Sequence, residues 1–254
     1  MPKPIVVFLG PTLGHEEATM LLDAIYLPPA EQGSVVAAVT AYDPGAIALI
    51  DGAFAKVPAV RHKEILWALA RGIPVHGAAS IGALRAAELA PFGMRGHGFI
   101  HRWYRATPFA DDDEVAVATM PAELGARALS EALINIRLTL KRAERRAVIP
   151  RDVRVALEDL ARSLHFVDRT YERLFARARA RFTAEWQDWI EATERFVAEH
   201  AIDQKKADAK ALLQFLAANP PSKQTAPFAF RMTEAWAIDL DDAAIALPDP
   251  SDDA

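Results

Sequence analysis

Short apolar segments alternate with helical periodicity over the first hundred residues of this chain. In chain order, the alternating segments are 5–9, 17–25, 35–39, 46–50, a helix after Pro58, 73–77 and a helix after Ser80. Alternating strands and helices favour a largely parallel sheet with helices on its faces. The sequence therefore predicts an α/β fold, a mostly parallel sheet with flanking helices, followed by a helical C-terminal region.

The apolar spacing changes after residue 129. Leu133, Ile136 and Leu140 fit a buried helix, and Pro150 suits the first turn of another. Further along the chain, a set of five apolar residues is spaced like one face of an amphipathic helix: Phe182, Trp186, Trp189, Phe196 and Val197. The residues from 238 onward include six aspartates and no basic residue. We expect an α/β core over 1–128, a helical region over 129–218 and an extended, flexible acidic tail over 219–254.

Composition narrows the class of protein. The chain has 254 residues, 52% of them hydrophobic and 25% charged, with a formal net charge of -5, which is typical of a soluble globular protein and not of a nucleic-acid binder. It has no apolar run of about 18 residues that would span a membrane, and its first residues lack the features of a signal peptide. A cytoplasmic protein is expected.

The chain has no cysteine, which excludes disulfides and thiolate metal sites. Any sulfur chemistry would use sulfur carried by another molecule. His15, His62 and His76 lack the spacing of metal ligands, so we expect neither a metal nor a cofactor.

Residues 74–89 read as a short buried strand that continues directly into a helix, with Ser80 at the turn. Free N–H groups at a helix N-terminus stabilise negative charge, including an oxyanion that forms during acyl transfer. Ser80 is therefore a candidate nucleophile. The alternative is an ordinary helix cap, because serine is a favoured N-cap residue.

The preceding helical pattern places His62 and Lys63 in its first turn. A lysine that is partly buried at a helix N-terminus is a candidate general base for a serine. The alternative is a solvated surface lysine.

Polar or glycine-rich segments follow three of the predicted strands, at 10–14, 51–52 and 77–80. Because the carboxyl ends of parallel strands meet at one edge of a sheet, we expect a pocket there. Residues 10–14 lack the lysine and hydroxyl of a phosphate-binding loop, so a tight turn is favoured over phosphate binding. Asp51 orients a polar group in this pocket or binds the turn at Gly52.

Between residues 99 and 125 the periodicity loosens. The acidic run Asp111–Asp113 and Glu114 precedes the apolar residues Val115 and Val117. This pattern favours the cap of a short helix or strand. Metal binding is the alternative, although no histidine or spaced fourth acid supports it.

Five sequence runs resemble the TfuA-like family and fall within residues 5–140: VFLGPTLGHEEA, DAIYLPPAEQG, IDGAF, VPAVRHKEILWALARGIPVHGAASIGALRAAELAPFGM and DDDEVAVATMPAELGARALSEALINIR. The resemblance implies a partner protein of YcaO enzymes in peptide backbone thioamidation, in which the YcaO enzyme activates an amide with ATP. It also implies that the chain binds that enzyme and releases sulfide from a thiocarboxylated, ubiquitin-like sulfur-carrier protein. The hydrolase-like Ser-Lys pair of the family maps by motif onto Ser80 and Lys63.

The residues agree with this chemistry. Ser80 would attack the thiocarboxylate carbon after Lys63 removes its proton, and the N–H of Ile81 with one from residues 10–13 would hold the oxyanion. The remaining residues of the predicted substrate-binding set are Gly77, Gly10, Pro11, Thr12, Asp51 and His62. The rival hypothesis is a non-catalytic adaptor that recruits the sulfur carrier and the peptide to the YcaO enzyme. A nucleotide-binding domain is a third hypothesis, which the missing phosphate-binding motif disfavours.

Overall fold

The computed structural model describes residues 3–53, 57–107, 110–120, 126–242, 244, 245 and 247. The chain forms two compact units, which we call the sheet unit (Met1–Pro108 with Lys206–Ala254) and the helical unit (Phe109–Lys205). This division differs from the expected boundaries after residues 128 and 218. Most of helix α10 (Gln204–Ala218) belongs to the sheet unit because it packs on the sheet.

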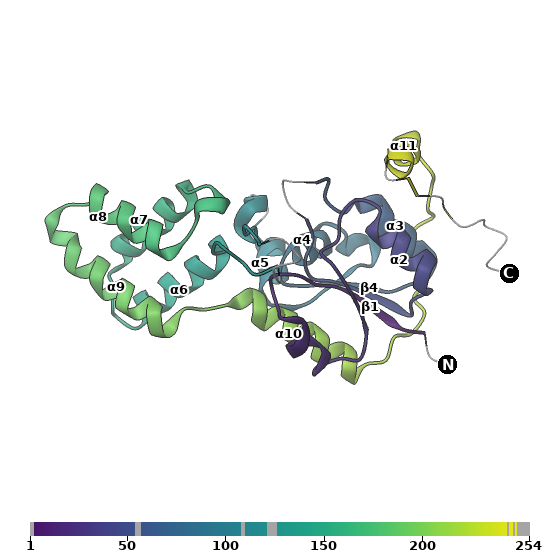
Figure 1. The fold of residues 1–254 in the computed structure, drawn as a ribbon, viewed down its shortest axis with the longest axis horizontal. Coiled ribbons are helices and arrows are strands. Elements are labelled where there is room, and N and C mark those ends of the chain that lie inside the picture. Colours follow the sequence, from purple (N-terminus) through teal and green to yellow (C-terminus); the bar gives the residue numbers. More distant parts are fainter. Residues whose placement is uncertain are drawn as a thin grey trace. The chain divides into compact units, whose positions relative to one another are not determined.

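The sheet unit is built on five parallel strands, which confirms the predicted fold class. They are β1 (Ile5–Phe8), β2 (Ile25–Leu27), β3 (Ala46–Leu49), β4 (Val75–Gly77) and β5 (Arg95–Gly96), in the order β2-β1-β3-β4-β5. Figure 1 labels β1 and β4 of this sheet. Every residue of β1 and β3 is buried, as expected for strands with helices on both faces.

The strand order determines where the helices lie. The chain moves across the sheet in one direction from β1 to β2 and in the other direction in all later connections. Because crossovers between parallel strands are right-handed, α1 (His15–Thr19) lies on one face of the sheet. The helices on the other face are α2 (Ser34–Tyr42), α3 (His62–Ala70) and α4 (Ile81–Glu88). Helix α10 covers the face of α1, where Leu212, Leu213 and Leu216 share one apolar cluster with Val7 and Ala48. The segment η1 (Ala90–Phe92) connects α4 to β5, and α5 (Gly98–Ala106) follows β5.

Four segments differ from the sequence expectation. Strand β2 includes Ile25, which the periodicity placed at the end of a helix, because α1 is only five residues long and Ile25 pairs with Val6. Residues 35–39 lie inside helix α2, and α5 occupies the start of the loosened region after residue 98. The expected extended tail contains helix α11 (Glu234–Asp242), which forms because Trp236 and Leu240 bury their side chains.

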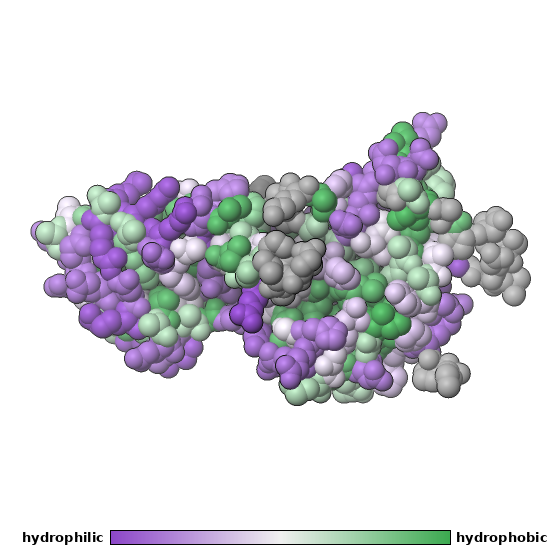
Figure 2. All heavy atoms as spheres, in the orientation of Figure 1, coloured by the Kyte–Doolittle hydropathy of each residue, from purple (hydrophilic) through white to green (hydrophobic). Residues whose placement is uncertain are grey.

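The helical unit contains α6 (Leu133–Arg145), α7 (Arg151–Ser163), α8 (Tyr171–Arg181) and α9 (Gln187–His200), with short 3-10 segments η2 (Asp112–Glu114), η4 (Phe166–Asp168) and η5 (Ala184–Trp186). Leu133, Ile136 and Leu140 lie in its buried core, as predicted. The expected single apolar face over residues 182–197 is divided, because α8 ends before Phe182 and α9 begins after Trp186. Hydrophilic residues cover much of the surface of this unit in Figure 2.

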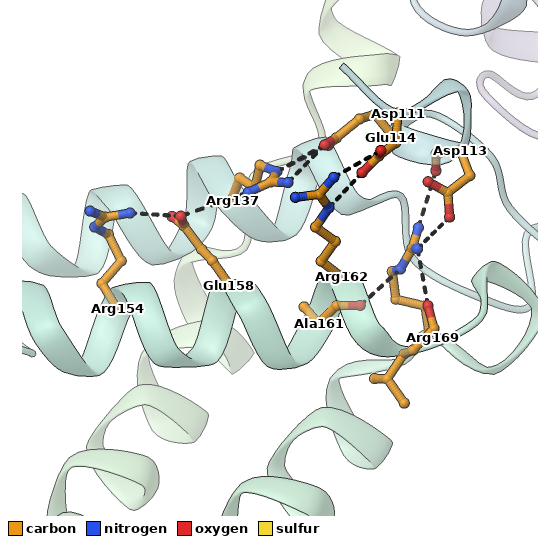
Figure 3. A network of polar contacts seen from close by, with 10 residues as sticks. Asp111, Asp113, Glu114, Arg137, Arg154, Glu158, Ala161, Arg162 and Arg169 are labelled. Atoms are coloured by element: carbon orange, nitrogen blue, oxygen red, sulfur yellow. Dashed lines mark hydrogen bonds and ion pairs between the residues drawn. The ribbon is translucent and has the colours of Figure 1, made fainter. Parts of the chain in front are cut away.

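The acidic run of the helical unit is held by arginines (Figure 3). Asp111 pairs with Arg162 at 2.6 Å, and Glu114 pairs with Arg137 at 2.8 Å. Asp113 pairs at 2.6 Å with the fully buried Arg169, whose guanidinium also donates to the carbonyls of Ala161 and Leu164. These carboxylates therefore tie η2 to the helices, which favours the structural interpretation over a metal site.

The buried His76 and the half-buried His97 form a pair at the β4–β5 edge of the sheet. Nδ1 of His76 lies 2.9 Å from Nε2 of His97, and the ring of Phe215 contacts both. Burial, with smaller contributions from His97 and Arg95, lowers the pKa of His76 to about 3. Burial likewise lowers the pKa of His97 to about 4.

These pKa values predict that acid destabilises the sheet unit. The unfolded chain binds more protons than the folded chain between pH 6.5 and pH 3, so the stabilising contribution of neutral His76 is complete above pH 6.5 and is lost as the pH falls. We expect His76 alone to lower the free energy of unfolding by about 2 kcal/mol between pH 7.5 and pH 5. Urea unfolding at both pH values measures it.

The control separates His76 from general acid effects. His76→Phe should reduce the loss, whereas replacement of the exposed His15 by glutamine should leave it unchanged. Equal pH dependence in wild type and His76→Phe would contradict the assignment.

None of the helices that the structure describes has the length and apolar character required to cross a lipid bilayer.

Candidate functional site

The loops after β1 and β3 meet at the carboxyl edge of the sheet, where the strand order reverses direction. The buried Asp51 carboxylate accepts hydrogen bonds from the backbone N–H of Gly10 at 2.9 Å and of Thr12 at 3.1 Å, and from the Thr12 hydroxyl at 2.5 Å. Such a reversal point is the usual ligand site of open α/β sheets. Asp51 therefore fixes the turn that contains Pro11 and orients the Thr12 hydroxyl.

Ser80 follows a tight connection between β4 and α4. A Cβ atom on Gly77 would lie 2.0 Å from the carbonyl oxygen of Gly82, and a Cβ on Gly82 would lie 1.7 Å from that of Leu49. Both positions therefore require glycine, because the turn packs directly on the sheet backbone. Ala79 has a φ of 66°, a left-handed conformation that is strained for a residue with a side chain.

The Ser80 side chain does not cap the helix. Ser80 is the N-cap residue of α4, but its hydroxyl accepts no capping hydrogen bond, and the residue is 8% exposed. A serine that served only as a cap would accept a hydrogen bond from the second or third N–H of the helix. No hydrogen bond of the Ser80 hydroxyl to any other described residue occurs at this position.

Ile81 connects the turn at Ser80 to the segment that follows β3. Its side chain lies against Gly52, where an added Cβ would be 2.5 Å away. Gly82 donates its N–H to Ile50 and Ala83 donates to Ser80, whereas no acceptor for the N–H of Ile81 is found among the described residues. This N–H remains available for an anion at the helix start.

Few residues of the turn after β1 can supply the expected second N–H donor to the oxyanion. In the turn after β1, Pro11 has no N–H, and Gly10 and Thr12 donate theirs to Asp51. Leu13 is the remaining residue of 10–13 that the sequence interpretation allows.

Lys63 and His62 make other contacts. The Lys63 amine donates to the carbonyl of Arg231 at 3.0 Å and lies 5.1 Å from the centre of the Phe230 ring. His62 pairs with Glu88 at 2.8 Å, and Arg85 donates to the carbonyl of Val60 at 3.2 Å, so the start of α3 runs beside the later turns of α4.

The structure therefore brings together part of the predicted site. Gly10, Pro11, Thr12 and Asp51 form one group, and Gly77, Ser80 and Ile81 form a second group beside it, joined through Gly52. Lys63 begins a helix on the same face of the sheet as α4, but no hydrogen bond between Lys63 and Ser80 occurs in the described part of the chain. The contacts of Lys63 with residues 230–231 were missed, since nothing in the periodicity indicates where the C-terminal segment lies.

The strained turn before Ser80 allows a test of this geometry. Ala78 and Ala79 are both fully buried, so either change to glycine removes a buried methyl group. Only Ala79→Gly also relieves a positive φ, which glycine adopts without the steric cost of a Cβ. Ala79→Gly should therefore lower the free energy of unfolding by about 1 kcal/mol less than the matched control Ala78→Gly. Urea unfolding of both variants measures the difference. An equal loss in both would contradict the left-handed turn.

Among the described residues, no group of three or more histidine, cysteine or acidic side chains is placed to hold a metal ion. Fold and site together define an α/β protein with a serine at a strand–turn–helix junction on the carboxyl edge of a parallel sheet.

Residues 51–170 match the family described as TfuA-like protein, which supports the resemblance found in the sequence. Asp51, Lys63, Ser80 and the acidic run all lie within the match, whereas residues 10–12 precede it. Proteins of this family are associated with YcaO enzymes. A comparison with curated proteins found no match.

Proposed function

We propose that this protein is the partner of a YcaO enzyme in peptide backbone thioamidation and supplies it with sulfide. The sulfide comes from a thiocarboxylated, ubiquitin-like sulfur-carrier protein, which the chain hydrolyses with Ser80 as nucleophile and Lys63 as general base. The observation that carries the proposal is that the Ser80 hydroxyl and the neighbouring N–H of Ile81 have no hydrogen-bond partner among the described residues.

The proposed acylation step uses these groups together with Lys63. The Ser80 oxygen bonds to the thiocarboxylate carbon while Lys63 takes the hydroxyl proton, and the N–H of Ile81 stabilises the oxyanion together with the positive end of the α4 dipole. The carbon–sulfur bond then breaks, and the sulfur leaves as hydrosulfide with that proton. The carrier stays attached to Ser80 as an ester.

Water completes the cycle. It attacks the ester carbon, with Lys63 now accepting the proton of water, and returns the Ser80 hydroxyl and a carrier carboxylate. No step changes an oxidation state, so the reaction needs no redox cofactor. Asp51 positions the neighbouring turn without touching the reacting atoms.

A non-catalytic adaptor is the second candidate. The observation that favours it is the hydrogen bond of Lys63 to Arg231 in place of Ser80. In this role Lys63 would pair with the carboxylate at the end of the carrier, and Ser80 would only begin the helix.

Sulfide release distinguishes the two functions. The purified protein is mixed in excess with a thiocarboxylated carrier, without a YcaO enzyme, and free sulfide is measured against time. The hydrolase releases one sulfide per carrier, whereas an adaptor binds the carrier and releases none. Binding without release would overturn the hydrolase proposal.

A further inference from the structure

The C-terminal segment of the chain lies on the helix that carries Lys63. We call residues 228–242 the cover segment; it contains helix α11 and the residues just before it. Its carbonyl at Arg231 accepts a hydrogen bond from the Lys63 amine at 3.0 Å, and its Phe230 ring faces that amine at 5.1 Å. Lys63 thus meets this segment and not the nucleophile.

Aromatic contacts anchor the cover segment. Trp236 is 2% exposed, with its ring centre 6.5 Å from that of Trp67 on α3 and 5.1 Å from that of Phe230. Trp67 is itself buried. One indole therefore connects α3 to the same ring that faces Lys63.

Polar contacts orient the segment on the helix starts. Asp239 pairs with Arg61 at 3.3 Å, and its carbonyl accepts a hydrogen bond from the Gln32 side chain at 2.8 Å. Arg61 is the N-cap residue of α3, two residues before Lys63. The other side of α11 faces solvent, since Ile238 is 61% exposed.

We propose that the cover segment is an autoinhibitory element that holds Lys63 away from Ser80 and is displaced when a partner protein binds. This inference rests on the proposed function, in which Lys63 must accept a proton from Ser80. A base has to lie within hydrogen-bond distance of the serine, whereas here the Lys63 amine is held at the carbonyl of Arg231. Displacement of the cover segment would uncover the surface of α3 that Trp236 and Asp239 now contact. This surface fits a partner helix with the same pattern, an aromatic side chain followed three residues later by a carboxylate.

Among the described residues, the contacts between the cover segment and α3 are few, so the segment is suited to exchange. An exposed ion pair contributes about 1 kcal/mol or less, so the buried Trp236 ring is the main anchor. Local opening of such a segment needs much less free energy than global unfolding.

Two variants test the proposal in the full-length protein. Trp236→Ala removes the anchor, and Asp239→Arg places a positive charge beside Arg61. Ile238→Ala is the control, because it changes the solvent side of the same helix. Acetylation of Lys63 by an amine-reactive reagent, measured by mass spectrometry relative to the exposed Lys3, reports access to the amine independently of activity.

Both variants should raise the Lys63 acetylation rate and the rate of sulfide release at least about fivefold, the size expected when a locally stable contact is lost. Ile238→Ala should match the wild type. Unchanged acetylation in both variants would overturn the proposal that the cover segment is autoinhibitory, without contradicting the proposed hydrolase activity. Faster acetylation with no sulfide from any form would support the cover but contradict the hydrolase.

Discussion

Ser80→Ala should lower the rate of sulfide release by about a thousandfold or more while the protein stays folded, as expected when a covalent nucleophile is removed. The hydroxyl makes no capping hydrogen bond, so its loss should change the free energy of unfolding by less than about 1 kcal/mol. Single-turnover release from a thiocarboxylated carrier measures the activity, and urea unfolding measures the stability.

Two further variants complete this test. Lys63→Met keeps the aliphatic stem and should lower the rate by about a hundredfold or more, the usual contribution of a general base. Ser163→Ala is the matched control, since that hydroxyl only donates to the carbonyl of Leu160 in the helical unit. Undiminished release by Ser80→Ala would exclude Ser80 as the nucleophile.

Arg137→Met should destabilise the helical unit by about 3 kcal/mol or more, because it leaves a buried carboxylate without its countercharge. Glu114 is 2% exposed on its side chain and receives three hydrogen bonds from the Arg137 guanidinium (Figure 3). Burial already raises the pKa of Glu114, and the pairing with Arg137 opposes that rise. Urea unfolding followed by circular dichroism measures the loss.

A matched pair in the same network serves as the control. Arg162 and Asp111 are 55% and 36% exposed on their side chains, so Arg162→Met should cost about 1 kcal/mol or less. The double variant Arg137→Met with Glu114→Met should recover much of the stability, since it removes both charges. A similar small loss in both single variants would contradict a buried, structurally required pair.

Much of the sheet unit could be predicted from the sequence because its signals are local. Strands β1, β3 and β4 are short apolar segments followed by glycine or polar turns, and parallel connections place those turns at one edge. The direct passage from strand to helix at Ser80 was visible for the same reason. Strand β2 was missed because its three residues form a strand only by pairing with β1.

The contacts of the candidate site depend on tertiary packing. Asp51 meets residues about forty positions earlier, and Lys63 meets a carbonyl 168 positions later. No periodicity encodes such pairings. The left-handed conformation of Ala79 was also unpredictable, because alanine gives no signal for a positive φ.

The acidic run illustrates a different limit. Its residues were recognisable as a charged cluster, but the three arginines that hold them come from positions 137, 162 and 169. The sequence places those arginines in and around helices that could have faced solvent. The packing of η2 against α6 decides that Glu114 is buried and needs a partner.

The most direct test of the central claim is mass spectrometry of the protein after acid quenching of its reaction with a thiocarboxylated carrier. The account predicts an ester that joins the carrier to Ser80, with the combined mass of both proteins less one hydrogen sulfide. Release of sulfide with the Ser80 peptide unmodified at every quench time would contradict it.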